Sequence, residues 1–321
     1  MLMAKSIILH GGAGSWKDSR VREKAYIVME NCTRKAWTVL NNSNNALEAV
    51  VEAVKCMEDS GYLNAGVGSV LDILGNRTLD AGIMTSNGLI GAVSAVKATR
   101  NPVVLARIVA EKTPHIIIGG DGADTLAKLY SLPPLPPPPK HVVERYYESL
   151  KKLLSGEIKR DYWRKILSFI ESNENYRRLV ESLASFADTV GAVAVDDNGL
   201  LATAVSTGGV ILKLPGRIGD SPIPGAGFYS SRKVACSATG FGEMIIRSMP
   251  CLKLAEYIDQ GMDFEEALDN VITYVNETVG KDTMGFIAVD YEGRIGWRYN
   301  TEAMLIGYMD REGRVIVNHK P

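Results

Sequence analysis

Residues 187–195, Ala-Asp-Thr-Val-Gly-Ala-Val-Ala-Val, place Thr189 at the head of an apolar, β-branched run in the middle of the chain. A threonine there can be an ordinary strand residue. It can also become a new N-terminus if the chain breaks between Asp188 and Thr189. The freed residue would carry a hydroxyl nucleophile together with a primary amine. That amine, with an unperturbed pKa of about 8, could act as the base that a weakly acidic hydroxyl needs.

A second threonine, Thr207, follows eighteen residues later in the segment Ser-Thr-Gly-Gly, residues 206–209. The runs 190–195 and 200–206 flank Asp-Asp-Asn-Gly and predict a hairpin with a short turn. Such a hairpin brings its two open ends together, so Thr207 is expected beside Thr189, where its hydroxyl could orient the nucleophile. The alternative is a threonine that caps a strand before a Gly-Gly turn.

The loop over residues 214–227 is dense in glycine and proline and holds Arg217 and Asp220. An arginine offers a planar fork for a carboxylate, and an aspartate accepts hydrogen bonds from an ammonium group. The two side chains therefore match the charged ends of an α-amino acid. The alternative is a local salt bridge between them, which stiffens the loop and contributes little if exposed.

Two further segments could supply hydrogen-bond donors. Thr239-Gly240-Phe241-Gly242-Glu243 opens a predicted helix, and backbone N–H groups at such a turn suit an anion or an oxyanion, although many merely cap helices. The side-chain amide of Asn64, in Asn-Ala-Gly-Val-Gly, could donate to an oxyanion or stabilise a turn.

Other chemistries are excluded by their missing motifs. The sequence has no G-x-S-x-G elbow, P-loop or H-E-x-x-H motif, and its four histidines are too scattered for a histidine metal site. Gly12-Ala13-Gly14 faintly resembles a dinucleotide fingerprint but lacks the third glycine and a following βαβ pattern.

The elements that must position these residues follow from periodicity and capping signals. Asn45 is a plausible N-cap, with Glu48 as its capping-box partner, and Pro102 occupies the first position of a helix. Strands are predicted over 5–10, 70–74, 77–84, 115–119, 190–195, 200–206, 284–290 and 294–299, with strand-like pieces to 317. The runs 70–74 and 77–84 are predicted to form a hairpin that turns at Gly75-Asn76. Helices are predicted over 19–40, 45–59, 241–259 and 263–279. Direct hairpins and grouped helices favour an α+β fold of antiparallel sheets covered by helices.

A proline-rich segment, residues 133–139, interrupts this pattern and should be extended. Residues 140–185 are rich in Lys, Arg, Glu, Tyr and Leu, which predicts exposed helices or a partly ordered linker. The linker could be a hinge between two domains, which composition alone favours, or a tether that becomes a loose tail after a break at Thr189.

Composition is that of an ordinary globular protein of 321 residues with a formal net charge of −1. This charge argues against a broad electrostatic grip on nucleic acid or an anionic membrane, and no apolar run is long enough to span a bilayer. The first residues predict a strand rather than a signal peptide. Four scattered cysteines without a CxxC pair predict buried, reduced thiols in a cytoplasmic protein.

Together these segments resemble the plant-type asparaginase family, whose members are N-terminal nucleophile hydrolases with isoaspartyl peptidase activity. The resemblance covers residues 5–120 and 189–310, and residues 121–187 match only as the family's variable linker. The matching segments are His10–Gly14, Asn64–Gly68, Thr189–Val193, Ser206–Gly209, Leu214–Pro222 and Thr239–Glu243.

The resemblance implies a four-layer αββα sandwich and a dimer of α/β heterodimers. Each heterodimer would have an α subunit of residues 1–188 (core 1–130, linker 131–188) and a β subunit of residues 189–321. In the implied site, autocleavage after Asp188 exposes Thr189 as the nucleophile, and Thr207 assists it. Arg217 would bind the substrate's α-carboxylate, and Asp220 would bind its α-amine. Thr239 and Gly240 would form the oxyanion hole, with Gly240 also near the ammonium group and Asn64 lining the pocket.

The implied reaction releases L-aspartate from L-asparagine or β-aspartyl dipeptides without a required cofactor. A structural sodium ion is implied in the loop before Asn-Ala-Gly, held mostly through backbone carbonyls. Its expected ligands are Met57, Glu58, Ser60, Leu63, Ala65 and Val67. Small amino-acid or dipeptide substrates are expected as partners, and nucleic acid and membranes are not.

One position departs from the family pattern, because Asp188 stands where asparaginases of this type usually have glycine. An aspartate there is more typical of the related glycosylasparaginases, whereas His-Gly-Gly-Ala-Gly and Leu-Pro-Gly-Arg are of the asparaginase kind. The open alternatives are a glycosylasparaginase-like amidase, a taspase-like endopeptidase and an uncleaved small-molecule binder.

Overall fold

The structure, a computed structural model, describes residues 5–14, 16, 19–155, 157, 161–172 and 189–319. Before the linker its elements are β1 (Ser6–Gly14), α1 (Ser19–Ser43), α2 (Ala46–Asp59), the short 3₁₀ helix η1 (Gly66–Gly68), β2 (Leu79–Thr85), β3 (Ile90–Val96), α3 (Pro102–Lys112), β4 (Ile117–Gly119) and α4 (Gly120–Leu129). Later elements are α5 (Lys140–Leu154), α6 (Asp161–Glu171), β5 (Val190–Val195), β6 (Leu201–Thr207), β7 (Phe228–Ser230), β8 (Val234–Gly240), α8 (Gly242–Ser248), α9 (Pro250–Asp259), α10 (Phe264–Val279), β9 (Met284–Asp290), β10 (Ile295–Tyr299), β11 (Ala303–Met309) and β12 (Val315–Asn318).

These strands form two sheets, as the α+β prediction requires. The larger has the order β12-β11-β1-β5-β6-β2-β3-β4, and the smaller has the order β10-β9-β8-β7. Neighbours are antiparallel except for the parallel pair β3–β4. Strands from both sides of the linker alternate in the larger sheet, with β5 and β6 between β1 and β2. The linker therefore does not join two separate domains, and the prediction of an interdomain hinge is wrong.

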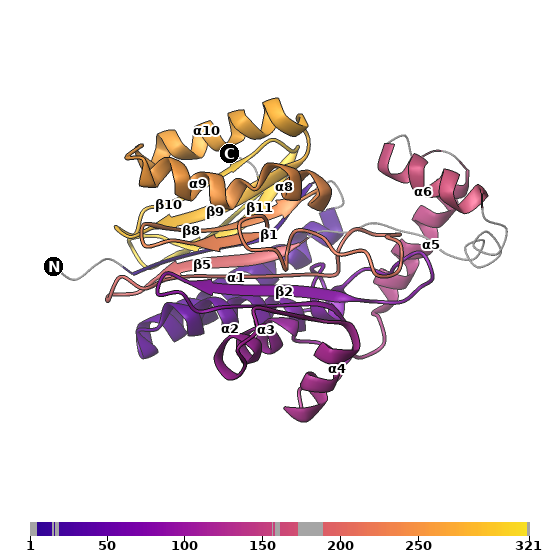
Figure 1. Ribbon diagram of the computed structural model, residues 1–321, viewed down its shortest axis with the longest axis horizontal. Coiled ribbons are helices and arrows are strands. Elements are labelled where there is room, and N and C mark those ends of the chain that lie inside the picture. Colours follow the sequence, from indigo (N-terminus) through magenta and orange to yellow (C-terminus); the bar gives the residue numbers. More distant parts are fainter. Residues whose placement is uncertain are drawn as a thin grey trace.

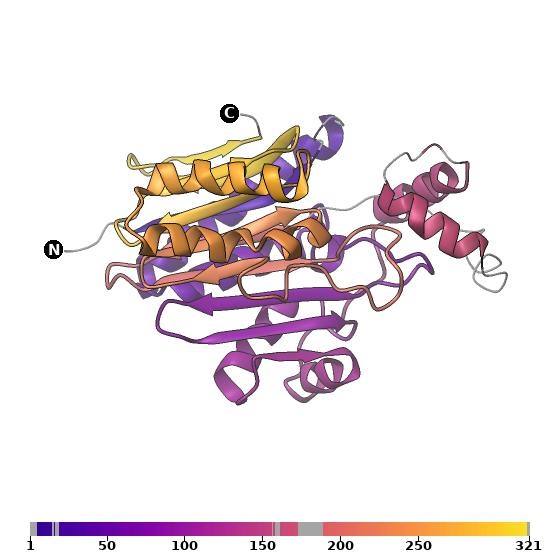
Figure 2. The same ribbon diagram turned by 45° about the horizontal axis from the view of Figure 1, so that its top comes forward.

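Helices cover the outer faces of the two sheets (Figure 1). The helices α1, α2 and α3 pack on the larger sheet, and α9 and α10 pack on the smaller one, as the turned view in Figure 2 also shows. Between the sheets lies an apolar layer that includes Ile8, Val193, Ala235 and Ile287. Buried β-branched and aliphatic side chains on both faces explain why β5 is a continuous apolar run instead of an alternating one.

Local capping chemistry sets several helix boundaries where the sequence predicts them. The Oδ1 atom of Asn45 accepts a hydrogen bond of 3.1 Å from the backbone N–H of Glu48 at the start of α2. Pro102 begins α3, and Asp263 caps α10 by accepting a hydrogen bond from the N–H of Glu265. The predicted hairpins β5–β6 and β9–β10 are both confirmed.

The hairpin predicted around Gly75-Asn76 is wrong. Residues 70–78 form no strand, and Oδ1 of Asp72 instead accepts hydrogen bonds from the backbone N–H groups of Leu74 and Asn76. This side chain fixes an irregular turn that competes with strand pairing. β2 pairs instead with β3 across the turn at Ser86-Asn87-Gly88.

The helix predicted over 241–259 is divided into α8 and α9 at Met249, whose φ of 47° is left-handed. The physical cause is Pro250, which has no N–H group for the helix ladder and disfavours helical geometry in the residue before it. In the linker, the predicted helices are present as α5 and α6. The predicted linker residues 173–185 lie outside the described part of the chain.

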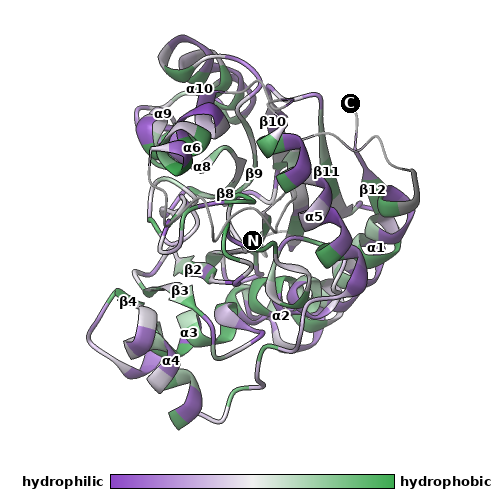
Figure 3. Ribbon diagram, turned by 90° about the vertical axis from the view of Figure 1, so that its right-hand side faces the viewer, coloured by the Kyte–Doolittle hydropathy of each residue, from purple (hydrophilic) through white to green (hydrophobic). Residues whose placement is uncertain are grey.

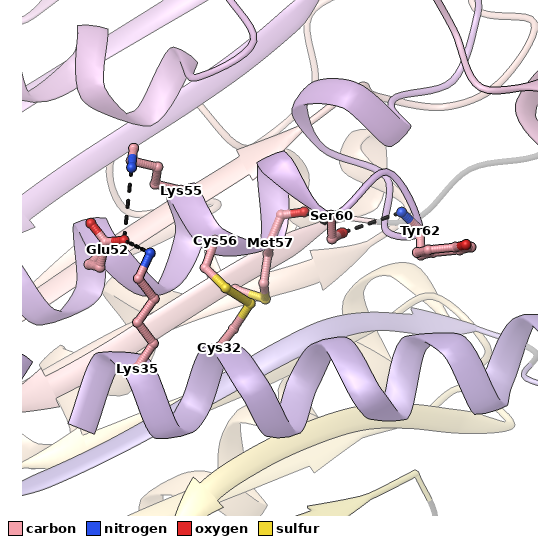
Figure 4. The surroundings of a disulfide bond; sticks show 8 residues. All are labelled: Cys32, Lys35, Glu52, Lys55, Cys56, Met57, Ser60 and Tyr62. Carbon is pink, nitrogen blue, oxygen red and sulfur yellow. Dashed lines mark hydrogen bonds and ion pairs between the residues drawn. A yellow bond between two sulfur atoms is a disulfide. The ribbon is translucent and has the colours of Figure 1, made fainter. Parts of the chain in front are cut away.

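The cysteines form disulfides, so the prediction of reduced thiols is wrong. Cys32 on α1 is bonded to Cys56 on α2, and Cys236 on β8 is bonded to Cys251 on α9. Figure 4 shows the first bond between its two neighbouring helices, with an ion pair between Lys35 and Glu52 alongside. Both pairs are distant in sequence, so only packing brings them together. The disulfides also remove the cysteine-based argument for a cytoplasmic location.

Among the described residues, no helix combines the length and the apolarity that crossing a bilayer requires.

We expect the disulfides to be detectable as stabilising cross-links. Replacing Cys32 and Cys56 together with serine should lower the free energy of unfolding by about 2–4 kcal/mol, because the cross-link restricts the unfolded chain. Urea denaturation of the two proteins measures this difference. A thiol titration of the freshly purified, denatured, unreduced protein is the control, and four reactive thiols there would contradict the assignment.

Candidate functional site

Two threonine hydroxyl groups meet at the open end of the β5–β6 hairpin. Val190 lies opposite Ser206 in the antiparallel register, which places Thr189 beside Thr207. The Oγ1 atom of Thr189 donates a hydrogen bond of 3.0 Å to Oγ1 of Thr207, and both residues are buried. The predicted proximity of these residues is confirmed. A hydroxyl that donates its proton to a neighbouring oxygen has its own lone pairs free for attack.

Thr207 is itself fixed by groups from two loops. Its Oγ1 atom accepts a hydrogen bond of 2.9 Å from the N–H of Gly209 and lies 3.5 Å from Nδ2 of Asn64. Asn64 also donates to the carbonyl of Gly209 and accepts from the N–H of Val70, each at 3.0 Å. The structure therefore places Asn64 as a turn-stabilising residue behind Thr207, with its amide engaged by protein groups.

Arg217 forms a two-point ion pair with Glu243 of α8. Its Nε and Nη2 atoms donate to the two carboxylate oxygens at 2.9 and 2.8 Å. The alternative of a salt bridge between Arg217 and Asp220 is wrong, because Glu243 takes the guanidinium fork. Burial lowers the pKa of Arg217, but the hydrogen bonds and charge of Glu243 outweigh this effect and leave the pKa raised. The guanidinium thus stays charged.

Asp220 presents a buried carboxylate oxygen without a protein partner. Its Oδ2 atom makes no hydrogen bond to any described residue, although the side chain is only 3% exposed. Burial raises the pKa of Asp220 to about 7, against the opposing charge of Arg217. A buried, unsatisfied carboxylate is costly unless a cation or donor completes it. Asp220 is therefore suited to accept hydrogen bonds from a bound ammonium group.

These groups line the same cavity. Its lining residues are Thr189, Thr207, Gly209, Val210, Arg217, Asp220, Gly240 and Gly242. A side chain at Gly242 would place its Cβ 2.6 Å from Nη2 of Arg217. Gly240 has a φ of 140°, and its Cβ would lie 2.4 Å from the carbonyl oxygen of Thr283. Gly240 therefore requires glycine, and a side chain at Gly242 would displace the guanidinium of Arg217.

Thr239 and Gly240 lie together at the end of β8 but face different surroundings. Gly240 lines the cavity, whereas the Oγ1 atom of Thr239 accepts a hydrogen bond of 3.3 Å from the N–H of Ala13 in β1. The side chain of Thr239 thus links the two sheets. This contact also explains why the Gly-rich end of β1 lies close to the site.

His10 is a buried residue of β1 that lies opposite Gly191 in β5, the strand that follows Thr189. Its Nε2 atom lies 3.0 Å from Oγ of Ser237, and Gly191 leaves the space that the imidazole occupies, since a Cβ there would approach Nε2 to 2.4 Å. Burial lowers the pKa of His10 to about 3, against a hydrogen bond with the backbone of Thr189. The ring is therefore neutral near pH 7 and adds no charge beneath the site.

The sequence alone did not predict a role at the site for three charged residues. Glu243 stands in a recognised motif, but its pairing with Arg217 depends on the fold. Lys213 and Asp80 are completely buried beneath the loop that carries Arg217. Burial lowers the pKa of Lys213 and raises that of Asp80, and in each case the charge of the other opposes the shift. The sequence offers one signal for Lys213 and Asp80, because each is a charged residue inside an otherwise apolar segment.

The predicted sodium loop fits a cation only in part. Within the described residues there is no group of three or more His, Cys, Asp or Glu side chains that could hold a metal. Backbone oxygens suit a hard cation in kind. However, the carbonyl of Val67 accepts a hydrogen bond of 3.0 Å from Nη1 of Arg77, whose positive charge disfavours a second cation there. The carboxylate of Glu58 faces the N–H of Val103 and the amide of Asn101 instead.

Comparison with known proteins agrees with this geometry. The chain matches the family described as Asparaginase over residues 3–317. The chain belongs to this family. It is 41% identical over 306 residues to a plant-type L-asparaginase of Pyrobaculum calidifontis, covering 94% of this chain and 96% of that protein. It is 36% identical over 310 residues to an isoaspartyl peptidase of Escherichia coli, covering 94% of this chain and 92% of that protein. The protein is therefore a hydrolytic enzyme.

We expect Glu243 to be important for stability because it is the charged partner of Arg217, whose side chain is only 11% exposed. Glu243→Gln should lower the free energy of unfolding by about 1–3 kcal/mol, since a charged acceptor is replaced by a neutral one. Urea denaturation measures the change. The matched control is Glu256→Gln, which breaks an exposed pair with Lys253 and should change stability little. Equal effects of both substitutions would contradict this role.

Proposed function

We propose that the protein is a self-processing amidohydrolase that releases L-aspartate from L-asparagine and from β-aspartyl dipeptides. The observation that carries the proposal is the hydrogen bond of 3.0 Å between the hydroxyl groups of Thr189 and Thr207, inside a cavity that also holds Arg217 and Asp220. A nucleophile and both halves of an α-amino-acid site are thus adjacent. Membership of the asparaginase family supports the same chemistry.

Substrate binding uses the two charged groups of the cavity. The guanidinium of Arg217 binds the α-carboxylate, because Glu243 fixes its orientation through Nε and Nη2 and leaves Nη1 toward Gly209. Asp220 accepts hydrogen bonds from the α-ammonium group with its unpartnered oxygen. The side-chain carbonyl carbon of the substrate is thereby directed toward Thr189.

Maturation begins with attack of the Thr189 hydroxyl on the carbonyl carbon of Asp188, which lies outside the described residues. The peptide nitrogen of Thr189 leaves as an amine and takes a proton, which converts the peptide bond into an ester. Water then hydrolyses the ester. The products are an α chain ending at Asp188 and a β chain of residues 189–321 that begins with a free amine.

Turnover uses the same hydroxyl. The free amine of Thr189 accepts the hydroxyl proton while the oxygen attacks the substrate's side-chain amide carbon. The N–H of Gly240, with Thr239, stabilises the oxyanion, and Thr207 orients the nucleophile. The leaving amine takes the proton and departs as ammonia or an amino compound. Water then hydrolyses the acyl-enzyme and L-aspartate is released.

The charged groups of the cavity favour small substrates. Arg217 and Asp220 match the free carboxylate and ammonium of an α-amino acid, which an amino acid or a β-aspartyl dipeptide presents. The names of the relatives, L-asparaginase and isoaspartyl peptidase, support both substrates. A substrate series tests the choice: release of sugar amine from glycosylasparagine, or cleavage of proteins, would favour the glycosylasparaginase-like or taspase-like alternative.

The proposal includes the higher-order features of the family. We infer that the two sheets and their helices form the αββα sandwich of N-terminal nucleophile hydrolases and that two α/β heterodimers associate. A sodium ion, held by the carbonyls of Met57, Glu58, Ser60, Leu63 and Ala65, would stabilise the loop that carries Asn64. None of the chemical steps involves it.

Replacing the nucleophile should abolish both reactions. Thr189→Ala removes the attacking oxygen, so the protein should remain a single chain of 321 residues by mass and release no aspartate. Thr189→Ser keeps a hydroxyl group and is the matched control, with slower but detectable cleavage. Cleavage of the alanine variant at residue 188, or full activity in wild-type protein shown to be unbroken, would reject the proposal and favour a different nucleophile or an uncleaved protein.

Ligand binding should strengthen as pH rises through about 7. Asp220 has its pKa raised to about 7 by burial, so below that pH it is largely neutral and cannot pair with an ammonium group. The inhibition constant of L-aspartate should therefore fall roughly tenfold between pH 5.5 and 7.5, where aspartate itself does not titrate. Steady-state inhibition of the mature enzyme measures it. Asp220→Asn should bind weakly with no such dependence; the same pH profile in that variant would exclude Asp220 as its source.

A further inference from the structure

The segment that carries Lys213 is covered by the linker helices α5 and α6, at the end of the molecule that faces the viewer in Figure 3. Ile211 and Leu212, the two residues before Lys213, belong to an apolar cluster with buried side chains of both helices. Trp163 of α6 also donates a hydrogen bond of 3.4 Å from Nε1 to the carbonyl of Ile211. The two helices keep water away from this segment, so a charge within it is only weakly screened.

Lys213 is completely buried in this segment. Its Nζ atom donates a hydrogen bond of 3.1 Å to the carbonyl of Thr78, just before β2. Burial lowers the pKa of Lys213, the negative charge of Asp80 opposes this shift, and the positive charge of Arg217 adds to it. An apolar side chain would fill the same space without the cost of desolvating a charge. The lysine therefore requires a reason other than stability.

The backbone next to Lys213 is held in an unusual conformation. Leu212 has a left-handed φ of 54°, which residues other than glycine rarely adopt. Its N–H donates a hydrogen bond of 3.2 Å to the carbonyl of Leu71, and the carbonyl of Lys213 accepts one of 2.9 Å from the N–H of Ile73. These two bonds fix the strained residue and the lysine that follows it. Backbone strain of this kind is concentrated at functional sites.

Lys213 and Arg217 meet at Gly209, which lines the cavity. A side chain at Gly209 would place its Cβ 2.8 Å from Nζ of Lys213 and 3.2 Å from Nη1 of Arg217. The ammonium group and this corner of the guanidinium are therefore neighbours at one point of the cavity wall. Nη1 is also the nitrogen that Glu243 does not bind, since its carboxylate accepts from Nε and Nη2.

We propose that Lys213 is a positioning residue for the substrate's α-carboxylate, which it attracts from behind Gly209 while Arg217 makes the contact. The inference rests on the proposed role of Arg217 in substrate binding. Two positive charges at one point of a cavity attract a carboxylate more strongly than one, and weak screening beneath α5 and α6 increases the effect. Lys213 thereby selects substrates with a free α-carboxylate over those in which this group is blocked.

Two ligands of the same shape isolate the charge of the α-carboxylate. L-Isoasparagine is L-aspartate with its α-carboxylate replaced by an amide, while the ammonium group and the side-chain carboxylate are unchanged. Calorimetric titration of both into the mature enzyme gives the ratio of their affinities. Lys213→Met keeps a side chain of similar length without the charge. It should lower this ratio about 10-fold by weakening L-aspartate, with L-isoasparagine staying within about twofold.

The matched control is Lys140→Met on α5, which removes the same charge from a side chain that is 90% exposed. Solvent and salt screen that charge, so the ratio should stay within about twofold of the wild-type value. An unchanged ratio in Lys213→Met, or an equal fall in both variants, would overturn the proposal.

A second pair of proteins separates the effect of the charge from a failure to fold. Lys213→Met leaves Asp80 as a buried carboxylate without its opposing charge, so the mass of the two chains and a urea unfolding curve are checked first. Where this variant does not fold, Lys213→Met/Asp80→Asn is compared with Asp80→Asn, since neither contains that carboxylate. The double variant should show the lower ratio. Equal ratios, or failure of both lysine variants to fold, would assign Lys213 to folding and overturn the proposal.

Steady-state kinetics provide an independent readout. The α-carboxylate is bound in the ground state and in the transition state alike, so Lys213→Met should raise KM for a β-aspartyl dipeptide about 10-fold and keep kcat within about twofold. A lower kcat at an unchanged KM would place Lys213 in the chemical step and would contradict a role in carboxylate binding.

Direct binding distinguishes this inference from the proposed reaction, because calorimetry requires no turnover. If the wild type releases no aspartate from L-asparagine but its affinity ratio depends on Lys213, the proposed function fails and the role of Lys213 stands. If aspartate release is normal and the ratio does not depend on Lys213, the inference alone fails. Equal affinities of the wild type for the two ligands would overturn both the role of Arg217 and that of Lys213.

Discussion

The antiparallel pairing of β5 with β6 is the constraint on which the whole site depends. Its register sets Thr189 beside Thr207, and the pairing of β6 with β2 extends the same row to Asp80. Because side chains alternate between sheet faces, a slip of one residue would turn Thr207 toward the helices and remove the hydrogen-bond partner of the Thr189 hydroxyl. The buried apolar residues on both faces of β5 oppose such a slip.

Several buried charged residues surround this row, and they come from different segments of the chain. Arg217 pairs with Glu243, and the opposite charges of Lys213 and Asp80 limit each other's pKa shifts beneath the same loop. Asp220 lines the cavity, and its buried Oδ2 atom makes no hydrogen bond to the described residues. Each ion is costly to bury alone, so the paired ones fix the loop and the unpaired one retains the capacity to bind a cationic group. The site thus combines a fixed guanidinium with two buried carboxylate oxygens, Oδ2 of Asp80 and Oδ2 of Asp220, that have no hydrogen-bond partner among the described residues.

Much of the element pattern could be predicted, because the responsible signals are local. The turns of the β5–β6 and β9–β10 hairpins, the Asn45 cap and the proline at the start of α3 act within a few residues, and the structure has each of them. The hairpin around Gly75-Asn76 failed because the carboxylate of Asp72 accepts nearby backbone N–H groups, an interaction that a strand pattern does not reveal. The long predicted helix failed at Met249, although Pro250 was a visible signal.

The sequence by itself determined which reactive groups the site contains, because residue types decide where hydroxyl groups, carboxylate acceptors and guanidinium donors stand along the chain. It also placed Thr207 near Thr189, since a short hairpin is a local structure. Only the tertiary structure decided the partners: Glu243 for Arg217, Cys56 for Cys32 in a disulfide, and the ring of Phe241 for that of Tyr162. These contacts join segments far apart in the chain. They depend on how sheets and helices pack, which no local pattern specifies.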